Sequence, residues 1–103
     1  MNAKAGSLEL ERRWQQLFGT LAGGGEVAPS QRLRAEGMME TLVLLGYATP
    51  QQLQQSMAGC YQAAFNDSLE QVWGEHWRDV FPFPQIPGFG QRAPVYPSTS
   101  DEG

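Results

Sequence analysis

The side chains in this sequence that could do chemistry are one cysteine, one histidine and several carboxylates in the second half of the chain. Cys60, His76 and Asp79 are the residue types that supply a thiolate nucleophile, its base and the group that orients the base. On one continuous helix, the separation of Cys60 from His76 corresponds to about 24 Å, far beyond hydrogen-bond reach. Only a sharp break at residues 66–68 would bring them together. We therefore expect a non-catalytic protein in which Cys60 is a small buried apolar side chain.

Metal and phosphate sites lack residues that they require. One histidine and one cysteine cannot supply the three or four ligands of a zinc ion, and His76 with Asp79 would provide only half a site. The glycine run at 23–25 is followed by Glu26, where a phosphate-binding loop needs lysine and a hydroxyl residue. We therefore expect no cofactor, and we interpret the glycines as a connector.

The elements that must position these side chains are predicted to be helices, because apolar residues recur at helical spacing over most of the chain. Ser7 is expected to cap a first helix that ends at the glycine run. A second helix should begin near Pro29 and Ser30 and end at Gly46, in a left-handed conformation.

Two later positions carry the signature of a helix start. Thr49 and Gln52 flank Pro50 at capping-box spacing, which predicts a third helix from residue 50. Ser68 and Gln71 repeat the spacing, so either a fourth helix begins there or the third continues. Helical periodicity then persists to residue 81, where the prolines that follow end it.

The chain changes character after residue 81. Five of the seven prolines lie there, interleaved with aromatic and aliphatic residues, so we expect an extended arm over residues 82–97. Its apolar side chains need burial, either across the helices or in a partner's groove. The predicted architecture is an all-α bundle of three or four helices over residues 7–81, with a flexible segment at 1–6 and a disordered one at 98–103.

Composition limits the class of protein. The chain has 103 residues, a net charge of −4, 41% hydrophobic residues and a single cysteine, values that fit one small folded domain in a reducing compartment. No apolar stretch suits a membrane span or a secretory signal. We therefore expect a soluble cytoplasmic protein. Its small core makes a homo-oligomer or a hetero-complex plausible.

A helix-turn-helix DNA-binding protein is the first alternative, because the second and third predicted helices are joined by a short turn. Four glutamines near the start of the third helix could contact adenine edges: Gln51, Gln52, Gln54 and Gln55. However, no lysine or arginine lies between Arg34 and Arg78, and phosphate contacts normally supply most of the affinity. We expect no nucleic-acid partner, and the arginines near the first two helices are expected on a mixed, solvated face: Arg12, Arg13, Arg32 and Arg34.

Protein binding is the class that the residues favour. Methionines give adaptable apolar surface, and tryptophans dominate interface hot spots. We expect contacts to a partner from two regions, the second helix and the segment where helix gives way to arm. The residues are Met38, Met39, Leu42, Trp73, Trp77, Phe81, Phe83, Ile86 and Phe89.

The expected function is that of a small acidic regulator, an adaptor or an antagonist, which binds a larger protein. One form is an anti-activator that occludes the dimer or ligand surface of a transcription factor. A small accessory subunit of an enzyme is the remaining alternative.

Overall fold

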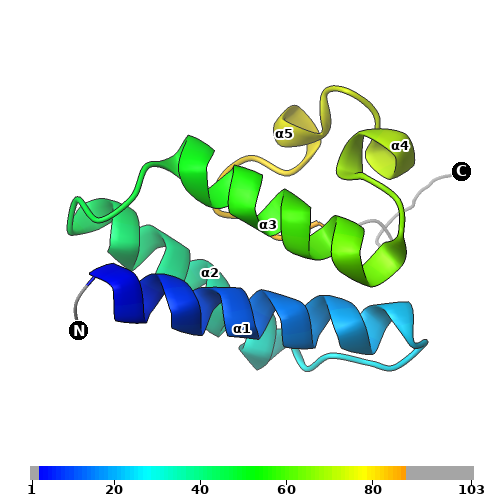
Figure 1. Cartoon of the computed structure of the whole chain (residues 1–103), viewed down its shortest axis with the longest axis horizontal. Coiled ribbons are helices and arrows are strands. Elements are labelled where there is room, and N and C mark those ends of the chain that lie inside the picture. The colour runs from blue at the N-terminus through cyan, green and yellow to red at the C-terminus, as the bar shows by residue number, and fades with distance from the viewer. Residues whose placement is uncertain (1–2, 88–103) are drawn as a thin grey trace, which may run out of the picture.

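The computed structural model describes residues 3–87, and these residues form helices and connecting segments without a strand (Figure 1). Three long helices and two short ones follow one another along the chain: α1 (Ala3–Ala22), α2 (Pro29–Leu44), α3 (Pro50–Phe65), α4 (Leu69–Trp73) and α5 (Trp77–Val80). The predicted all-α class is confirmed. Within this range no helix combines the length and apolar character needed to cross a membrane.

Helix α1 is the element against which the other two long helices pack. It contacts both α2 and α3, and Figure 1 shows α1 and α3 side by side with α2 behind them. Helices α4 and α5 lie above α3. The core between these elements is built from large side chains of all of them: Leu10, Trp14, Leu17, Phe18, Met39, Leu42, Leu53, Met57, Tyr61, Leu69, Trp77 and Ile86.

Aromatic side chains join α1 to the second half of α3. The ring of Phe18 meets Tyr61 edge to face at 5.2 Å between centroids, and Tyr61 stacks on Phe65 at 4.4 Å. Such pairs add roughly 0.5–1.5 kcal/mol to the gain from burying their area. This contact fixes α3 along α1 and so sets the frame on which α2 and the later elements lie.

The start of α1 differs from the prediction. The helix begins at Ala3, so Ser7 lies inside it and does not cap it. Residues 3–5 are alanine and lysine, which have high helix propensity, and the buried Gly6 continues the face that packs on the core. The expected flexible segment therefore does not extend over residues 3–6, and residues 1–2 lie outside the described range.

The predicted end of the second helix and start of the third are confirmed. Gly46 has φ 77°, and the amide of Tyr47 donates to the carbonyl of Leu42 at 2.9 Å, which closes α2. At the start of α3, the Gln52 amide donates to the Thr49 hydroxyl at 3.1 Å. The Thr49 amide donates in return to the Gln52 side chain at 3.0 Å.

A separate fourth helix does form, but it is short. Asn66 adopts a left-handed conformation with φ 61° and ends α3, after which Ser68 and Gln71 make the predicted capping box for α4. Gly74 then interrupts the helix with φ 95°. The prediction of unbroken helical periodicity to residue 81 is therefore wrong, because a glycine at this angle leaves the helical region of backbone space.

Residues 81–87, which we call the strap, lie on the helices of their own chain. Phe81 and Ile86 are buried, and Pro87 is fully buried. The Ile86 amide donates to the Glu36 carboxylate on α2 at 3.1 Å. Of the two placements left open for the arm, across the helices or in a partner's groove, residues 82–87 adopt the first. Residues 88–97 and the predicted disordered segment 98–103 lie outside the described residues.

Candidate functional site

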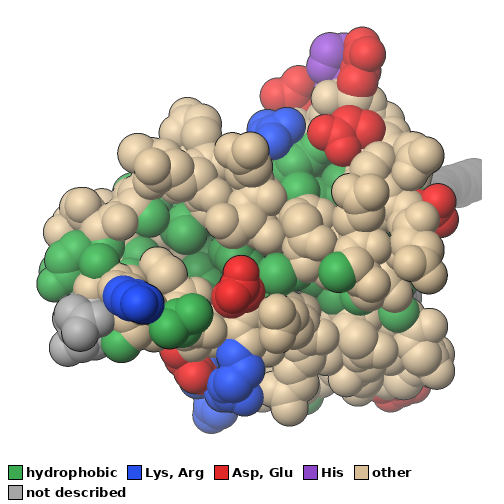
Figure 2. All heavy atoms as spheres, in the orientation of Figure 1, with side chains coloured by type: hydrophobic (Ala, Val, Ile, Leu, Met, Phe, Trp, Pro, Cys, Tyr) green, Lys and Arg blue, Asp and Glu red, His purple; other side chains and the backbone are tan. Residues whose placement is uncertain are grey.

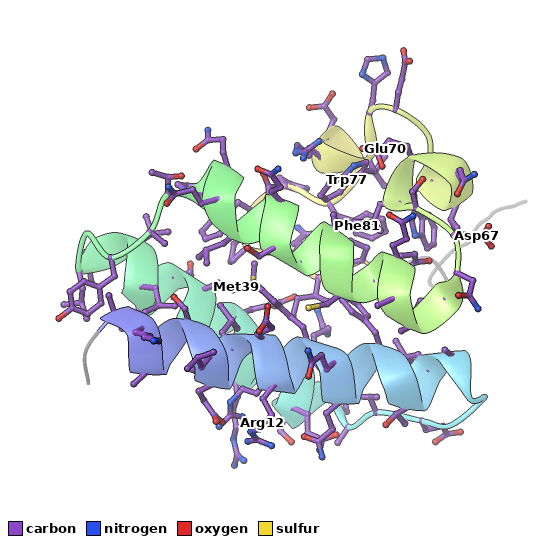
Figure 3. All side chains as sticks on the ribbon, viewed as in Figure 1. Arg12, Met39, Asp67, Glu70, Trp77 and Phe81 are labelled. Carbon is purple, nitrogen blue, oxygen red and sulfur yellow. The ribbon has the colours of Figure 1, made fainter. Side chains whose placement is uncertain are left out.

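The structure places five of the nine predicted contact residues in the core of the chain itself: Met39, Leu42, Trp77, Phe81 and Ile86. Figure 3 shows Met39 between the long helices, and Trp77 and Phe81 beneath α4 and α5. Their expected location on a surface is therefore corrected. A bundle of this size has few large side chains with which to fill its interior, and it uses these.

The other predicted contact residues offer little free surface. Met38, Trp73 and Phe83 are partly buried and pack against the core. Trp73 also meets Phe81 edge to face at 5.0 Å between ring centroids. Phe89 lies outside the described residues. The segment around Trp73 and the strap is thus held by contacts within the chain.

The residues of the considered catalytic triad are not brought together. Cys60 is buried, and burial first and the Glu11 carboxylate second raise the pKa of its thiol, which disfavours the nucleophilic thiolate. The His76 side chain is 79% exposed and pairs with Glu75 at 3.3 Å. Figure 2 shows the histidine among acidic side chains at the margin of the molecule. Within residues 3–87 no group of three or more metal-ligating side chains gathers.

Two of the four glutamines of the helix-turn-helix alternative, Gln52 and Gln54, are engaged or buried within the chain. The side chain of Gln52 is exposed but accepts from the Thr49 amide at the α3 cap, Gln54 is buried, and Gln51 and Gln55 are exposed. The arginines carry acidic neighbours as well. Glu9 pairs with both Arg12 and Arg13 on α1, and Arg32 pairs with Glu36 on α2: the distances are 2.7, 3.0 and 3.4 Å. The ion pairs agree with the predicted mixed face.

Large apolar side chains are exposed on several elements, among them Leu8 on α1 and Val72 on α4, and α2 exposes two on the side that faces away from the core. Ala35, Met39 and Leu42 point into the core, whereas Leu33 is 56% exposed and Leu44 is 85% exposed. At 100° per residue, Leu33 and Leu44 stand on the side of the helix opposite these core residues. We call Leu33, Arg34, Gly37, Glu40, Thr41 and Leu44 the outer face of α2.

Two hollows flank the centre of this face. The first has a volume of about 430 Å³ between α1 and α2, and the second has about 630 Å³ beside the strap. Both are lined by Gly37 and Thr41; Arg13 and Met38 also line the first, and Phe83 also lines the second. Because Gly37 has no side chain, the surface of α2 is recessed at this residue, which lines both hollows. A side chain from another molecule can enter on either side.

Two residues of opposite charge lie at equal separations from Gly37 in the sequence. Arg34 precedes it by three residues and lines the first hollow, and Glu40 follows it by three residues and lines the second. Both are exposed, and neither has an ion pair or a hydrogen bond with the described part of the chain. The face therefore combines exposed leucines, a glycine and two unpaired charges of opposite sign.

Three of the residues predicted to contact a partner lie on α2, namely Met38, Met39 and Leu42, whereas the leucines that the outer face of α2 exposes are Leu33 and Leu44. Neither leucine is among the nine residues predicted to contact a partner. The available signal was their spacing. Leu33 and Leu44 are three helical turns apart, and both are out of phase with Met39 and Leu42.

Comparisons of the chain with protein-family models, with curated proteins and with solved structures find no match.

Proposed function

We propose that this protein is a non-catalytic protein-binding regulator that docks to a larger protein through the outer face of α2. The observation that carries the proposal is the pair of exposed leucines on the face of α2 that points away from the core, Leu33 and Leu44, which lie on either side of Gly37. Burying an exposed leucine yields about 1.5–3 kcal/mol. An apolar patch rimmed by charged residues is typical of an interaction site.

The occupant that fits this face is a helix with apolar residues along one side and charges opposite in sign to those of α2. A carboxylate of the partner would pair with Arg34, and a cationic group of the partner would pair with Glu40. The lowered surface at Gly37 allows a second helix to approach closely. If a larger protein uses such a helix for its own dimerisation or ligand binding, docking to α2 would block that surface. When the partner is a transcription factor, this is the action of an anti-activator.

The proposal is tested with a matched pair of leucines. Leu33 on α2 and Leu8 on α1 have the same exposed fraction, 56%, but lie on different surfaces. A photo-cross-linking amino acid at position 33 should trap a distinct partner in the producing cell, and one at position 8 should not. With the identified partner purified, Leu33→Ser and Leu44→Ser should each weaken binding at least about tenfold, and Leu8→Ser should leave it unchanged.

Two outcomes contradict the proposal. Equal cross-linking from positions 33 and 8 would mean that α2 has no special role, and unchanged affinity of the α2 variants would place the partner elsewhere. Deletion of the strap is a poor test, because Ile86 is buried in the core and its loss would destabilise the fold together with any interface.

A further inference from the structure

We infer that the first hollow, between α1 and α2, is a binding site for a small carboxylate with an apolar body, such as a medium-chain fatty acid. Arg13 on α1 and Arg34 on α2 bind the carboxylate group, and the apolar body lies against Met38 and Leu42. A small-molecule site goes beyond the proposed function, which concerns a protein partner.

Two arginines from different helices line this hollow, and none of its lining residues is acidic. Arg34 is exposed and has no ion pair or hydrogen bond with residues 3–87. Arg13 is partly buried, and the Glu9 carboxylate lies 3.0 Å from its Nε, while its two terminal nitrogens have no partner among the described residues. Glu9 thus restrains the Arg13 side chain and leaves its outer edge for a ligand. Guanidinium groups bind carboxylates through charge-assisted hydrogen bonds.

The neighbourhood of the hollow is cationic, although the chain as a whole has a net charge of −4. Arg12 and Arg13 share the single carboxylate of Glu9, at 2.7 and 3.0 Å. Arg34 adds a further positive charge. Figure 3 shows Arg12 on the side of α1 away from α3, and Figure 2 shows a group of Lys and Arg side chains at the lower margin of the same view. An anionic ligand is therefore attracted to this part of the surface.

The remainder of the lining suits a hydrocarbon chain. Met38 is partly buried, Leu42 is 1% exposed, and Gly37 contributes no side chain. The Thr41 hydroxyl donates to the Gly37 carbonyl at 2.9 Å, so its proton is already used within the helix. The hollow has a volume of about 430 Å³, within the range of small-molecule sites, which combine an apolar lining with a few polar groups. An apolar carboxylate therefore fits better than a small inorganic anion.

The second hollow provides a comparison within the same molecule. It is larger, about 630 Å³, and it shares Gly37 and Thr41 with the first. However, Glu40 lines it and no arginine or lysine does, so a carboxylate would be repelled there. The charges therefore assign the ligand to the first hollow.

Octanoate and methionine-methyl NMR of the purified full-length chain test the site. Octanoate should shift the Met38 methyl signal with saturation and a dissociation constant of about 1 mM. The Met57 methyl, which lies in the core away from the hollow, should not shift. Acetate lacks the apolar chain and 1-octanol lacks the charge, so each should bind at least about tenfold more weakly.

Two matched pairs of variants locate the contacts. Arg34→Gln and Lys4→Gln each remove one exposed positive charge, but only Arg34 lines the hollow. Arg34→Gln should weaken octanoate binding at least about tenfold, and Lys4→Gln should leave it unchanged. Gly37 and Gly59 both lie inside long helices, and neither has another atom within 4 Å of an added Cβ. Gly37→Gln places a side chain at the hollow and should weaken binding, whereas Gly59→Gln should not.

Three results would overturn the inference: equal shifts of Met57 and Met38, binding of 1-octanol as tight as that of octanoate, or equal affinity of Arg34→Gln and Lys4→Gln. One consequence rests on the proposed function. Gly37 and Thr41 belong both to the hollow and to the outer face of α2, so a bound carboxylate would compete with a docked partner.

The two proposals fail separately. The octanoate titration uses the purified chain alone, whereas cross-linking from position 33 reports the larger partner. Octanoate binding without specific cross-linking would support the small-molecule site and count against the proposed function. Specific cross-linking without saturable octanoate binding would remove the small-molecule site and leave the proposed function standing.

Discussion

The carboxylate of Glu36 is predicted to hold the strap on the bundle. It is buried on α2, accepts the Ile86 amide at 3.1 Å and pairs with Arg32 at 3.4 Å. In Glu36→Ala the Ile86 amide loses its acceptor inside the protein, and an unsatisfied buried donor costs about 1–3 kcal/mol. We therefore expect the free energy of unfolding to fall by about 1–3 kcal/mol.

Two further variants separate the hydrogen bond from the ion pair. Glu36→Gln keeps an oxygen that can accept from Ile86 and should cost less than Glu36→Ala. Arg32→Ala removes the partly exposed ion pair and leaves the Glu36 carboxylate in place as the acceptor for Ile86, and such pairs contribute about 0–1 kcal/mol. The expected order of destabilisation is Glu36→Ala first, Glu36→Gln second and Arg32→Ala last.

Urea unfolding followed by tryptophan fluorescence measures this order, since two of the three tryptophans, Trp73 and Trp77, lie next to the strap. Amide hydrogen exchange at Ile86 gives an independent readout: protection should be lost in Glu36→Ala and kept in Arg32→Ala. Equal destabilisation by Glu36→Ala and Arg32→Ala, or unchanged protection of the Ile86 amide, would refute the reasoning.

Three further predictions concern local features. Thr49→Ala and Ser68→Ala each remove a capping hydroxyl and should lower the free energy of unfolding by about 0.5–2 kcal/mol in urea titrations, whereas Ser56→Ala on the exposed side of α3 should change it little. Gly46→Ala forces a side chain into a left-handed conformation and should cost about 1–2 kcal/mol by the same titrations; no loss would mean that the turn relaxes. Because burial raises the pKa of Cys60, the folded state holds the thiol proton to higher pH than the unfolded chain. The pH midpoint of iodoacetamide alkylation of Cys60 should therefore be higher without urea than in urea, and an equal or lower midpoint would contradict burial as the cause. By linkage, Cys60 contributes to the free energy of unfolding below the pKa that its thiol has in the unfolded chain, and this contribution declines as the pH rises above that pKa.

Local signals in the chain were enough to predict most helix boundaries. The capping residues around Pro50, the spacing of Ser68 from Gln71 and the placement of Gly46 act within a few residues of one another, so they can be recognised without knowledge of the fold. The misses also have local causes. Residues 3–5 join α1 through helix propensity, and Gly74 breaks the last helical segment although the apolar spacing continues through it.

The candidate site depended on contacts between distant elements. Apolar residues occur on several sides of α2, so its pattern separates Leu33 and Leu44 from Met39 and Leu42 but does not tell which of the two pairs faces the core. Which side of α2 is buried depends on its contacts with α1 on one side and with the strap on the other. The strap contact joins Glu36 to Ile86, which are 50 residues apart in the sequence. The sequence by itself therefore determined the long helices and most of their ends, because those depend on short-range hydrogen bonds and backbone preferences. Only the tertiary structure decided which leucines remain exposed, because burial depends on which surfaces of the folded chain meet.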